Sequence, residues 1–210
     1  MAYESGRREL NKEQTRRAVR QAAMALFRTH GFDQVTTTQV AQAAGVSPAT
    51  LFNHFATKED LFFGQVRQLE RELTELVSAV PPGESILTAL QGHVLYELTA
   101  GRAETRPTDV GTFHAMVAAS PNLQAREAEI YERRATVLTT ALIEAGQDSM
   151  VAQVAARQYI GAEQLIAGEL RRRTAGRRST RRTLAELDEF VAEVFGLLRT
   201  GLGDLAPQRP

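Results

Sequence analysis

The sequence contains no cysteine and no tryptophan, and its apolar runs are short. The stretch from Phe190 to Leu198 is interrupted by Glu193 and falls well short of the ~20 apolar residues that a membrane-spanning helix needs. The amino terminus is polar and charged and has no apolar segment of the kind that forms a secretory signal. We therefore expect a cytoplasmic protein that is not secreted and has no membrane partner.

Residues in patterns suited to catalysis or metal binding are also scarce. The sequence has four histidines, and no two of them are four residues apart, the helical spacing at which paired histidines bind a metal. It contains no nucleophile elbow, no phosphate-binding loop and no dinucleotide-binding glycine motif. We therefore predict no catalytic residue, no metal site and no cofactor, and conclude that the protein is not an enzyme.

Charge is balanced over the 210 residues but unevenly distributed. Lysine and arginine total 25, as do aspartate and glutamate, so the net charge is zero. Basic residues exceed acidic ones in 1–60 and again in 171–210, whereas acidic residues predominate in 61–170. This pattern fits a molecule that presents one end to the phosphates of a nucleic acid and keeps the rest away.

The most informative local pattern begins at Thr36, where two short helices joined by a tight turn are expected. Thr36 and Gln39 form a capping box, which starts a helix, and Gly45 supplies a left-handed backbone that ends it. Ser47 is a favoured N-cap and Pro48 a favoured first helical residue, so a second helix begins at once. The pattern predicts a helix-turn-helix.

The second of these helices has two distinct faces. At ~100° per residue, Leu51 and Phe55 share one face, whereas Ala49 and Asn53 share the opposite face. An alanine can contact a thymine methyl group and an asparagine can bond bidentately to adenine in the major groove. The exposed face is therefore interpreted as a DNA-reading face. The alternative is a purely structural helical corner inside another all-α protein.

The segment from Gly45 to Leu61 resembles, almost residue for residue, the DNA-binding signature of TetR-type (TetR/AcrR) transcriptional regulators. The resemblance extends back through the pairs Thr15-Arg16, Ala22-Ala23, Leu26-Phe27 and Gly31-Phe32. The sequence departs from the usual family residues at Thr37, Ala49 and Phe52. From the motif and the resemblance, we predict DNA contacts by Thr36, Thr37, Ser47, Pro48, Ala49, Thr50, Phe52, Asn53, His54 and Lys58.

Helical spacing continues along the rest of the chain, and no segment alternates as a β-strand does. We predict an all-α fold of about nine helices. An N-terminal three-helix DNA-binding domain should be followed by a C-terminal helical ligand-binding and dimerisation domain. The expected parts are a flexible arm at 1–11, the helix-turn-helix domain at 12–60 with its reading motif at 35–54, and the effector-binding domain at 61–205.

One helix is expected to belong to both domains. Thr57 and Asp60 form a second capping box, and the apolar spacing that follows predicts an unbroken helix from Lys58 to about Val80. Such a helix would act as a lever between the domains. Lys58, at the positive end of the helix dipole, is interpreted as a contact to a DNA phosphate.

The resemblance also implies a small-molecule effector bound among helices of the second domain. A mainly apolar cavity with a few polar groups is typical of such sites. Each candidate also has a structural alternative, a core residue whose polar atom bonds to the backbone. The predicted ligand-binding residues are His93, Tyr96, Glu97, Phe113, His114, Met116 and Tyr131.

Two amphipathic helices near the end of the chain carry wide apolar faces, which suggest a partner. A capping box of Thr183 and Glu186 should start the last helix. The predicted dimer interface consists of Tyr159, Ile160, Leu187, Val191, Val194, Phe195 and Leu198. The arginine-rich segment 171–182 lies between these helices and allows two interpretations, an anion-binding surface or a solvated loop at a helix end.

Taken together, these patterns predict a sequence-specific transcriptional regulator, a repressor by the family norm, that binds double-stranded operator DNA. It should bind a palindromic operator as a homodimer, because a single reading helix covers only a few base pairs. A small, largely apolar effector should modulate this binding. The alternative is an all-α interaction or scaffold protein in which the helix-turn-helix is structural.

Overall fold

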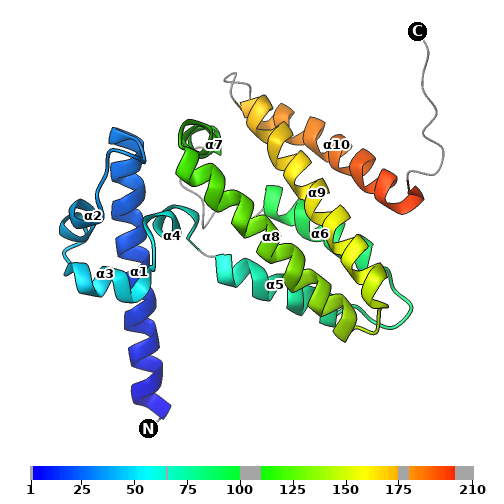
Figure 1. The fold of residues 1–210 in the computed structure, drawn as a ribbon, viewed down its shortest axis with the longest axis horizontal. Helices are drawn as coiled ribbons and strands as arrows, with labels where there is room; N and C mark the ends of the chain where they lie inside the picture. Colours follow the sequence, from blue (N-terminus) through cyan, green and yellow to red (C-terminus); the bar gives the residue numbers. More distant parts are fainter. Residues whose placement is uncertain (1, 65, 100–109, 175–179, 202–210) are drawn as a thin grey trace. The chain divides into compact units, whose positions relative to one another are not determined.

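The computed structural model describes residues 2–64, 66–99, 110–174 and 180–201, and in this part of the chain all regular structure is α-helical (Figure 1). The predicted all-α fold is confirmed. The polar sequence from 101 to 108 predicts a loop, and this segment lies outside the described residues. None of the described helices is long and apolar enough to cross a membrane. The described residues form ten helices, α1 (Ala2–His30), α2 (Thr37–Ala43), α3 (Pro48–His54), α4 (Lys58–Phe63), α5 (Val66–Ser78), α6 (Ile86–Thr99), α7 (Val110–Ala119), α8 (Pro121–Glu144), α9 (Ser149–Thr174) and α10 (Thr180–Thr200).

The chain divides into two compact units. The first comprises Met1–Val66 together with Met116–Glu127, and the second comprises Arg67–Ala115 together with Ala128–Pro210. Helices α1 to α4 therefore form one unit with the junction between α7 and α8, whereas α5, α6, α9, α10 and most of α8 form the other. Helix α8 contributes residues to both.

The first unit has an aromatic core around α1. The rings of Phe27 and Phe32 lie 4.9 Å apart, and Phe62 of α4 packs on both, edge-on to Phe32 at 5.8 Å. Leu51 and Phe55 are buried, as their shared face predicts. Burying a side chain of this size contributes about 1.5–3 kcal/mol, so these residues hold α3 firmly against α1 and α2.

Helix α4 is much shorter than predicted. It begins at Lys58 with the expected capping box of Thr57 and Asp60, but it ends at Gly64, whose φ is +69° and ψ is −93°. Arg20 of α1 packs against Gly64 so closely that an added Cβ would lie 2.3 Å from its Cζ. The predicted unbroken helix from Lys58 to Val80 is therefore wrong, because a glycine breaks it and α1 occupies the space at the break.

The junction between α7 and α8 belongs to the first unit, although it is far from the other residues of that unit in the sequence. Ser120 is buried, its hydroxyl donates to Oδ1 of Asp33 at 3.0 Å, and it also accepts a hydrogen bond from the backbone N–H of Leu123. Arg126 lies 2.8 Å from Oδ1 of Asp60. The beginning of α8 is thus bonded to the same unit as the reading helix.

The second unit has a continuous apolar core formed by α5, α6, α8, α9 and α10. Tyr159 of α9 and Phe195 of α10 meet edge-on, with their ring centres 6.3 Å apart. Six of the seven residues predicted to form a dimer interface are buried in this core, and the seventh is partly buried against it. The apolar stripe of each helix therefore packs against its neighbour in the same chain, and a dimer interface at these residues stays a prediction.

Two helix starts also differ from expectation. The predicted flexible arm at 1–11 is helical from Ala2, since it contains glutamate and arginine, which favour helix even without an apolar stripe. Helix α10 begins at Thr180, so Thr183 is not its N-cap. The carboxylate of Glu186 lies 3.3 Å from Arg173 of α9.

The described start of the arginine-rich segment forms the last turn of α9. This supports the second of the two interpretations, in which the arginines lie at a helix end. Arg172 and Arg173 both bond to Glu169 one turn earlier, and these hydrogen bonds lower the pKa of the Glu169 carboxyl to about 2. Arg173 also lies over the ring of Phe190. Arg177 and Arg178 fall outside the described residues.

Candidate nucleic-acid interface and ligand cavity

The reading helix α3 is held by the local contacts that the sequence predicts. The Ser47 hydroxyl accepts the backbone N–H of Thr50 at 3.0 Å and lies 2.9 Å from the Thr50 hydroxyl. Gly45 adopts φ +67° in the turn before it. The capping box of Thr36 and Gln39 is present at the start of α2. These bonds fix both helices from within the motif.

The opposite face of α3 is open. Pro48, Ala49 and Asn53 are exposed, and Phe52 is 50% exposed although it is a large aromatic residue. Leu51 on the other face is fully buried. An exposed ring beside an exposed amide, with no acidic group on the helix, can enter a DNA groove without repelling phosphate. Within the motif, Thr50 and His54 are half-buried, and the hydroxyls of Thr36, Ser47 and Thr50 already form bonds inside it.

Lys58 has a partner inside the unit. Its ammonium lies 4.2 Å from the centre of the Phe32 ring and 3.5 Å from the backbone oxygen of Asp33. Partial burial lowers the pKa of Lys58, and the nearby carboxylates of Asp33 and Glu59 act in the opposite direction. A phosphate contact by Lys58 would therefore use an ammonium already positioned by Phe32.

Basic residues of α1 lie beside the end of α3. The Arg16 guanidinium covers the Phe55 ring at 4.9 Å and donates to the backbone oxygen of Gly64 at 3.1 Å. Burial lowers the pKa of His54, and the positive charges of Arg16 and Lys12 lower it further. His54 is thus biased toward its neutral form. Arg16 and Arg20 both lie at the end of α4, where cations suit the helix dipole.

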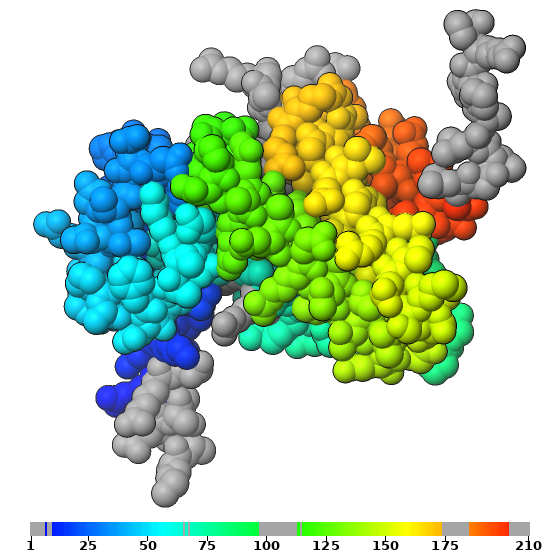
Figure 2. Space-filling view, viewed as in Figure 1, coloured from blue at the N-terminus to red at the C-terminus, as the bar shows by residue number. Residues whose placement is uncertain are grey.

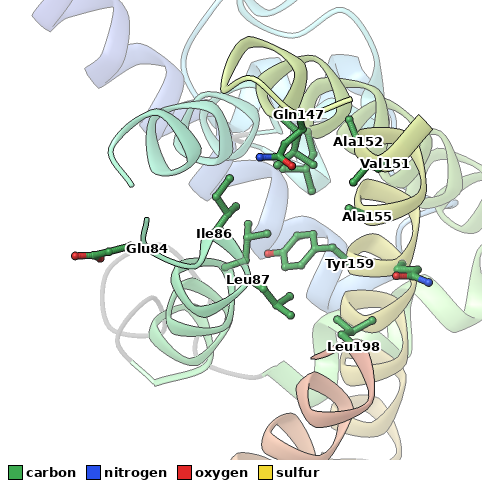
Figure 3. A pocket seen from close by; sticks show the side chains of 13 residues that line it. Glu84, Ile86, Leu87, Gln147, Val151, Ala152, Ala155, Tyr159 and Leu198 are labelled. Carbon is green, nitrogen blue, oxygen red and sulfur yellow. The ribbon is translucent and has the colours of Figure 1, made fainter. Parts of the chain in front are cut away.

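The second unit contains a cavity of about 300 Å³ between α6, α8, α9 and α10 (Figure 3). Its wall is mainly aliphatic, and the Tyr159 ring projects from α9 toward Ile86 and Leu87 of α6. None of the seven predicted ligand residues is among the residues described as lining it. Of those seven, Tyr96 is 61% exposed and His93, Phe113, Met116 and Tyr131 are half-buried, whereas the side chains of Glu97 and His114 lie outside the description.

Apolar side chains also remain on the surface of α9 and α10. Val154 and Leu165 of α9 are 52% and 56% exposed, and Leu197 of α10 is 58% exposed. Helix α9 lies at the surface in the face shown in Figure 2. Glycines at 161 and 168 have no atom within 4 Å of the position that a Cβ would occupy. The surface of Val154, Leu165 and Leu197 is here called the outer apolar surface.

Comparison with known proteins agrees with this geometry. Residues 19–64 match the family described as "Bacterial regulatory proteins, tetR family". The nucleoid occlusion factor SlmA of Alteromonas mediterranea is 32% identical over 137 residues, covering 63% of this chain and 69% of that protein. The transcriptional regulator TcmR of Streptomyces glaucescens is 31% identical over 87 residues, covering 41% of this chain and only 38% of that protein.

Solved structures show the same fold. NalD, the secondary repressor of the MexAB-OprM multidrug efflux pump in Pseudomonas aeruginosa, has a TM-score of 0.56 and 18% identity, covering 87% of this chain and 97% of that chain. Thermus thermophilus FadR, a TetR-family repressor in complex with lauroyl-CoA, has a TM-score of 0.53 and 24% identity. The match covers 93% of this chain and 97% of that chain.

The fold and the exposed α3 define a helix-turn-helix protein of the DNA-binding class. The chain belongs to the TetR family and is a DNA-binding transcriptional regulator. Proteins of this family are non-enzymatic transcription factors that bind DNA and small ligands.

Proposed function

We propose that this regulator is a cytoplasmic repressor that binds a palindromic operator as a homodimer and responds to a small molecule bound in its second unit. The observation that carries the proposal is the face of α3. Phe52 and Asn53 are exposed there, whereas Leu51 and Phe55 anchor the helix in the core. A rigidly anchored helix with a free polar and aromatic face suits insertion into a major groove.

The requirement for a dimer follows from the size of the reading helix. Helix α3 has 7 residues and can reach only a few base pairs. Two copies related by a twofold axis, with half-sites ~34–36 Å apart, would read successive major grooves of a palindrome. The outer apolar surface supports such pairing, because a second copy packed there would bury the exposed side chains of Val154, Leu165 and Leu197.

For ligand binding to change DNA binding, one structural element must belong to both units. The break at Gly64 removes the long helix first expected for that role. We propose that α8 takes its place, since its residues up to Glu127 belong to the DNA-binding unit and those from Ala128 belong to the second unit. Ser120 and Arg126 bond to the first unit, while Leu138 and Leu142 on the same helix line the cavity.

A gel-shift experiment with the DNA flanking the protein's own gene tests the proposal. Wild-type protein should bind specifically, with a dissociation constant of about 10⁻⁸–10⁻¹¹ M, typical of such regulators. The double variant Phe52→Ala, Asn53→Ala should lose specific binding but keep its helical content. Gln153→Ala, a change at an exposed position of α9, serves as the control. Specific binding that survives the double variant would favour the alternative of a structural helix-turn-helix.

A further inference from the structure

The chemistry of the cavity in the second unit limits what can bind there. Nine of its 13 described lining residues are aliphatic or alanine, including Leu90, Leu138 and Ala152. Three more, Glu84, Gln147 and Gln158, are polar and exposed. The described lining residues thus include one acidic residue and no lysine, arginine or histidine. The described wall is mainly apolar, and its polar side chains besides Tyr159 are two amides and a carboxylate.

Tyr159, the remaining lining residue, offers its ring to the cavity, because its hydroxyl is already bonded. The phenol donates to Oε1 of Glu163 at 2.7 Å, and that carboxylate lies 2.8 Å from Arg134 of α8. Arg134 and Glu163 are both largely buried. Arg134, which comes one turn before the lining residue Leu138, is therefore neutralised by Glu163. Arg134 is not among the described residues that line the cavity.

We infer that this cavity binds a compact, mainly apolar molecule whose polar group is uncharged or cationic, and that it discriminates against carboxylates and phosphates. A cavity of about 300 Å³ is at the lower end of the range of small-molecule sites. An anionic group there would find no basic partner among the described lining residues. Glu84 is exposed and its side chain points away from Tyr159 (Figure 3), but its negative charge at the edge of the cavity still favours a cation over an anion.

This specificity differs from that of a structural relative. Thermus thermophilus FadR is in complex with lauroyl-CoA, a ligand that carries several phosphates. A phosphate-bearing ligand of that kind needs cationic partners. The described wall of this cavity has none, so the similarity of fold does not carry over to the ligand. The inference rests on the proposed function in taking this cavity as the effector site.

Three probes with the same eight-carbon tail test the inference by isothermal titration calorimetry on the full-length protein. They are octyltrimethylammonium, 1-octanol and octanoate. The cation and the alcohol should bind, and octanoate should bind about tenfold more weakly than the cation, since the sign of its interaction with Glu84 is reversed. Octanoate binding as tightly as the cation would overturn the inference.

Variants at the cavity make the test specific to this site. Glu84→Gln should abolish the preference for the cation over the alcohol and leave the affinity for the alcohol unchanged. Ala155→Phe, at an exposed lining residue, should fill the cavity and abolish binding of all probes. Gln153→Phe, which adds the same ring at an exposed position of α9 outside the cavity, is the matched control. Binding that survives Ala155→Phe would overturn the inference.

The same proteins tested for binding to DNA separate this inference from the proposed function. Probe binding with the predicted charge order supports the site even if DNA affinity does not change, in which case only the proposed effector role fails. Specific DNA binding without probe binding would overturn the inference and leave the DNA-binding proposal standing.

Discussion

Arg126 and Asp60 join the start of α8 to the helix that follows the reading helix. Nη2 of Arg126 lies 2.8 Å from Oδ1 of Asp60, while Oδ2 of the same carboxylate accepts the backbone N–H of Thr57 at 3.2 Å. One side chain therefore both caps α4 and binds α8. Because α8 continues into the second unit, a displacement of its start would act directly on the cap of α4.

A double-mutant cycle should detect this contact in the free energy of unfolding. Arg126→Met and Asp60→Asn, alone and together, should give a coupling energy of about 1 kcal/mol, as expected for a partly buried pair. The control is Arg157 with Glu132, a pair 3.4 Å apart whose side chains are 68% and 70% exposed. Its coupling should be close to zero. Equal coupling in the two cycles, measured by urea denaturation, would show that Arg126 does not hold α8.

Gly64→Ala should destabilise the first unit by about 1–3 kcal/mol, because alanine is strained at a positive φ and its Cβ would meet the Arg20 guanidinium. Gly92→Ala is the matched control, since Gly92 lies within α6 with no atom within 4 Å of its Cβ position. That change should stabilise by about 0.5–1 kcal/mol. Thermal unfolding monitored by circular dichroism measures both, and a neutral Gly64→Ala would show that α4 can extend.

Asn53 and Lys58 should affect DNA binding in different ways. Asn53→Ala should cost about 1–3 kcal/mol on the operator and relax its sequence preference, because an exposed amide reads a base. Lys58→Ala should weaken binding to all sequences alike and lower the salt slope by about one. It should also reduce stability by about 0.5–1 kcal/mol through loss of the contact with Phe32.

Fluorescence anisotropy at several salt concentrations, with operator and scrambled duplexes, separates the two roles. The Phe32→Leu variant is a control that removes the aromatic partner of Lys58 but keeps the lysine. It should lower stability while leaving the salt slope unchanged. An equal loss of specificity in Asn53→Ala and Lys58→Ala would contradict the division of roles.

His54 should make the stability of the first unit depend on pH. Its pKa in the folded protein lies below the ordinary value of 6.5, mainly because of burial and secondarily because of Arg16 and Lys12. The unfolded chain therefore binds more protons near pH 6, and the stability that His54 contributes is present above pH 6.5 and declines as the pH falls below it. His54→Gln should flatten urea-denaturation midpoints measured between pH 5 and 7.5, about the range in which His titrates. An unchanged slope in that variant would assign the pH dependence to another group.

A charged residue introduced on the outer apolar surface should prevent dimerisation without unfolding the chain. Leu165→Glu should give a helical monomer with weak operator binding, because Leu165 is exposed in the single chain. Phe195→Glu should instead unfold the second unit, because Phe195 is fully buried and an unpaired buried charge costs several kcal/mol. Leu10→Glu, which replaces an exposed leucine of α1, should remain dimeric. Analytical ultracentrifugation measures the oligomeric state of each protein, and a wild-type monomer at micromolar concentration would rule out the dimer.

The features that the sequence alone predicted correctly depend on contacts between residues close together in the chain. The caps at Thr36, Ser47 and Thr57 form as expected because each joins residues three apart, and such contacts depend little on the rest of the chain. Helical spacing likewise predicted the all-α fold, and the burial of Leu51 and Phe55 followed from their shared face. The reading helix could therefore be derived almost completely from its own residues.

Tertiary structure alone decided which distant groups meet. An apolar stripe indicates that a face is buried but not what buries it, so Tyr159 and Phe195 proved to pack in the core of one chain. The break at Gly64 is accompanied by Arg20 of another helix in the space beside it, and the bonds of Ser120 and Arg126 cross 87 and 66 residues. The cavity is likewise lined by side chains of four helices. Contacts between segments that are far apart in the sequence produce no periodic pattern, because the two partner residues have no regular spacing.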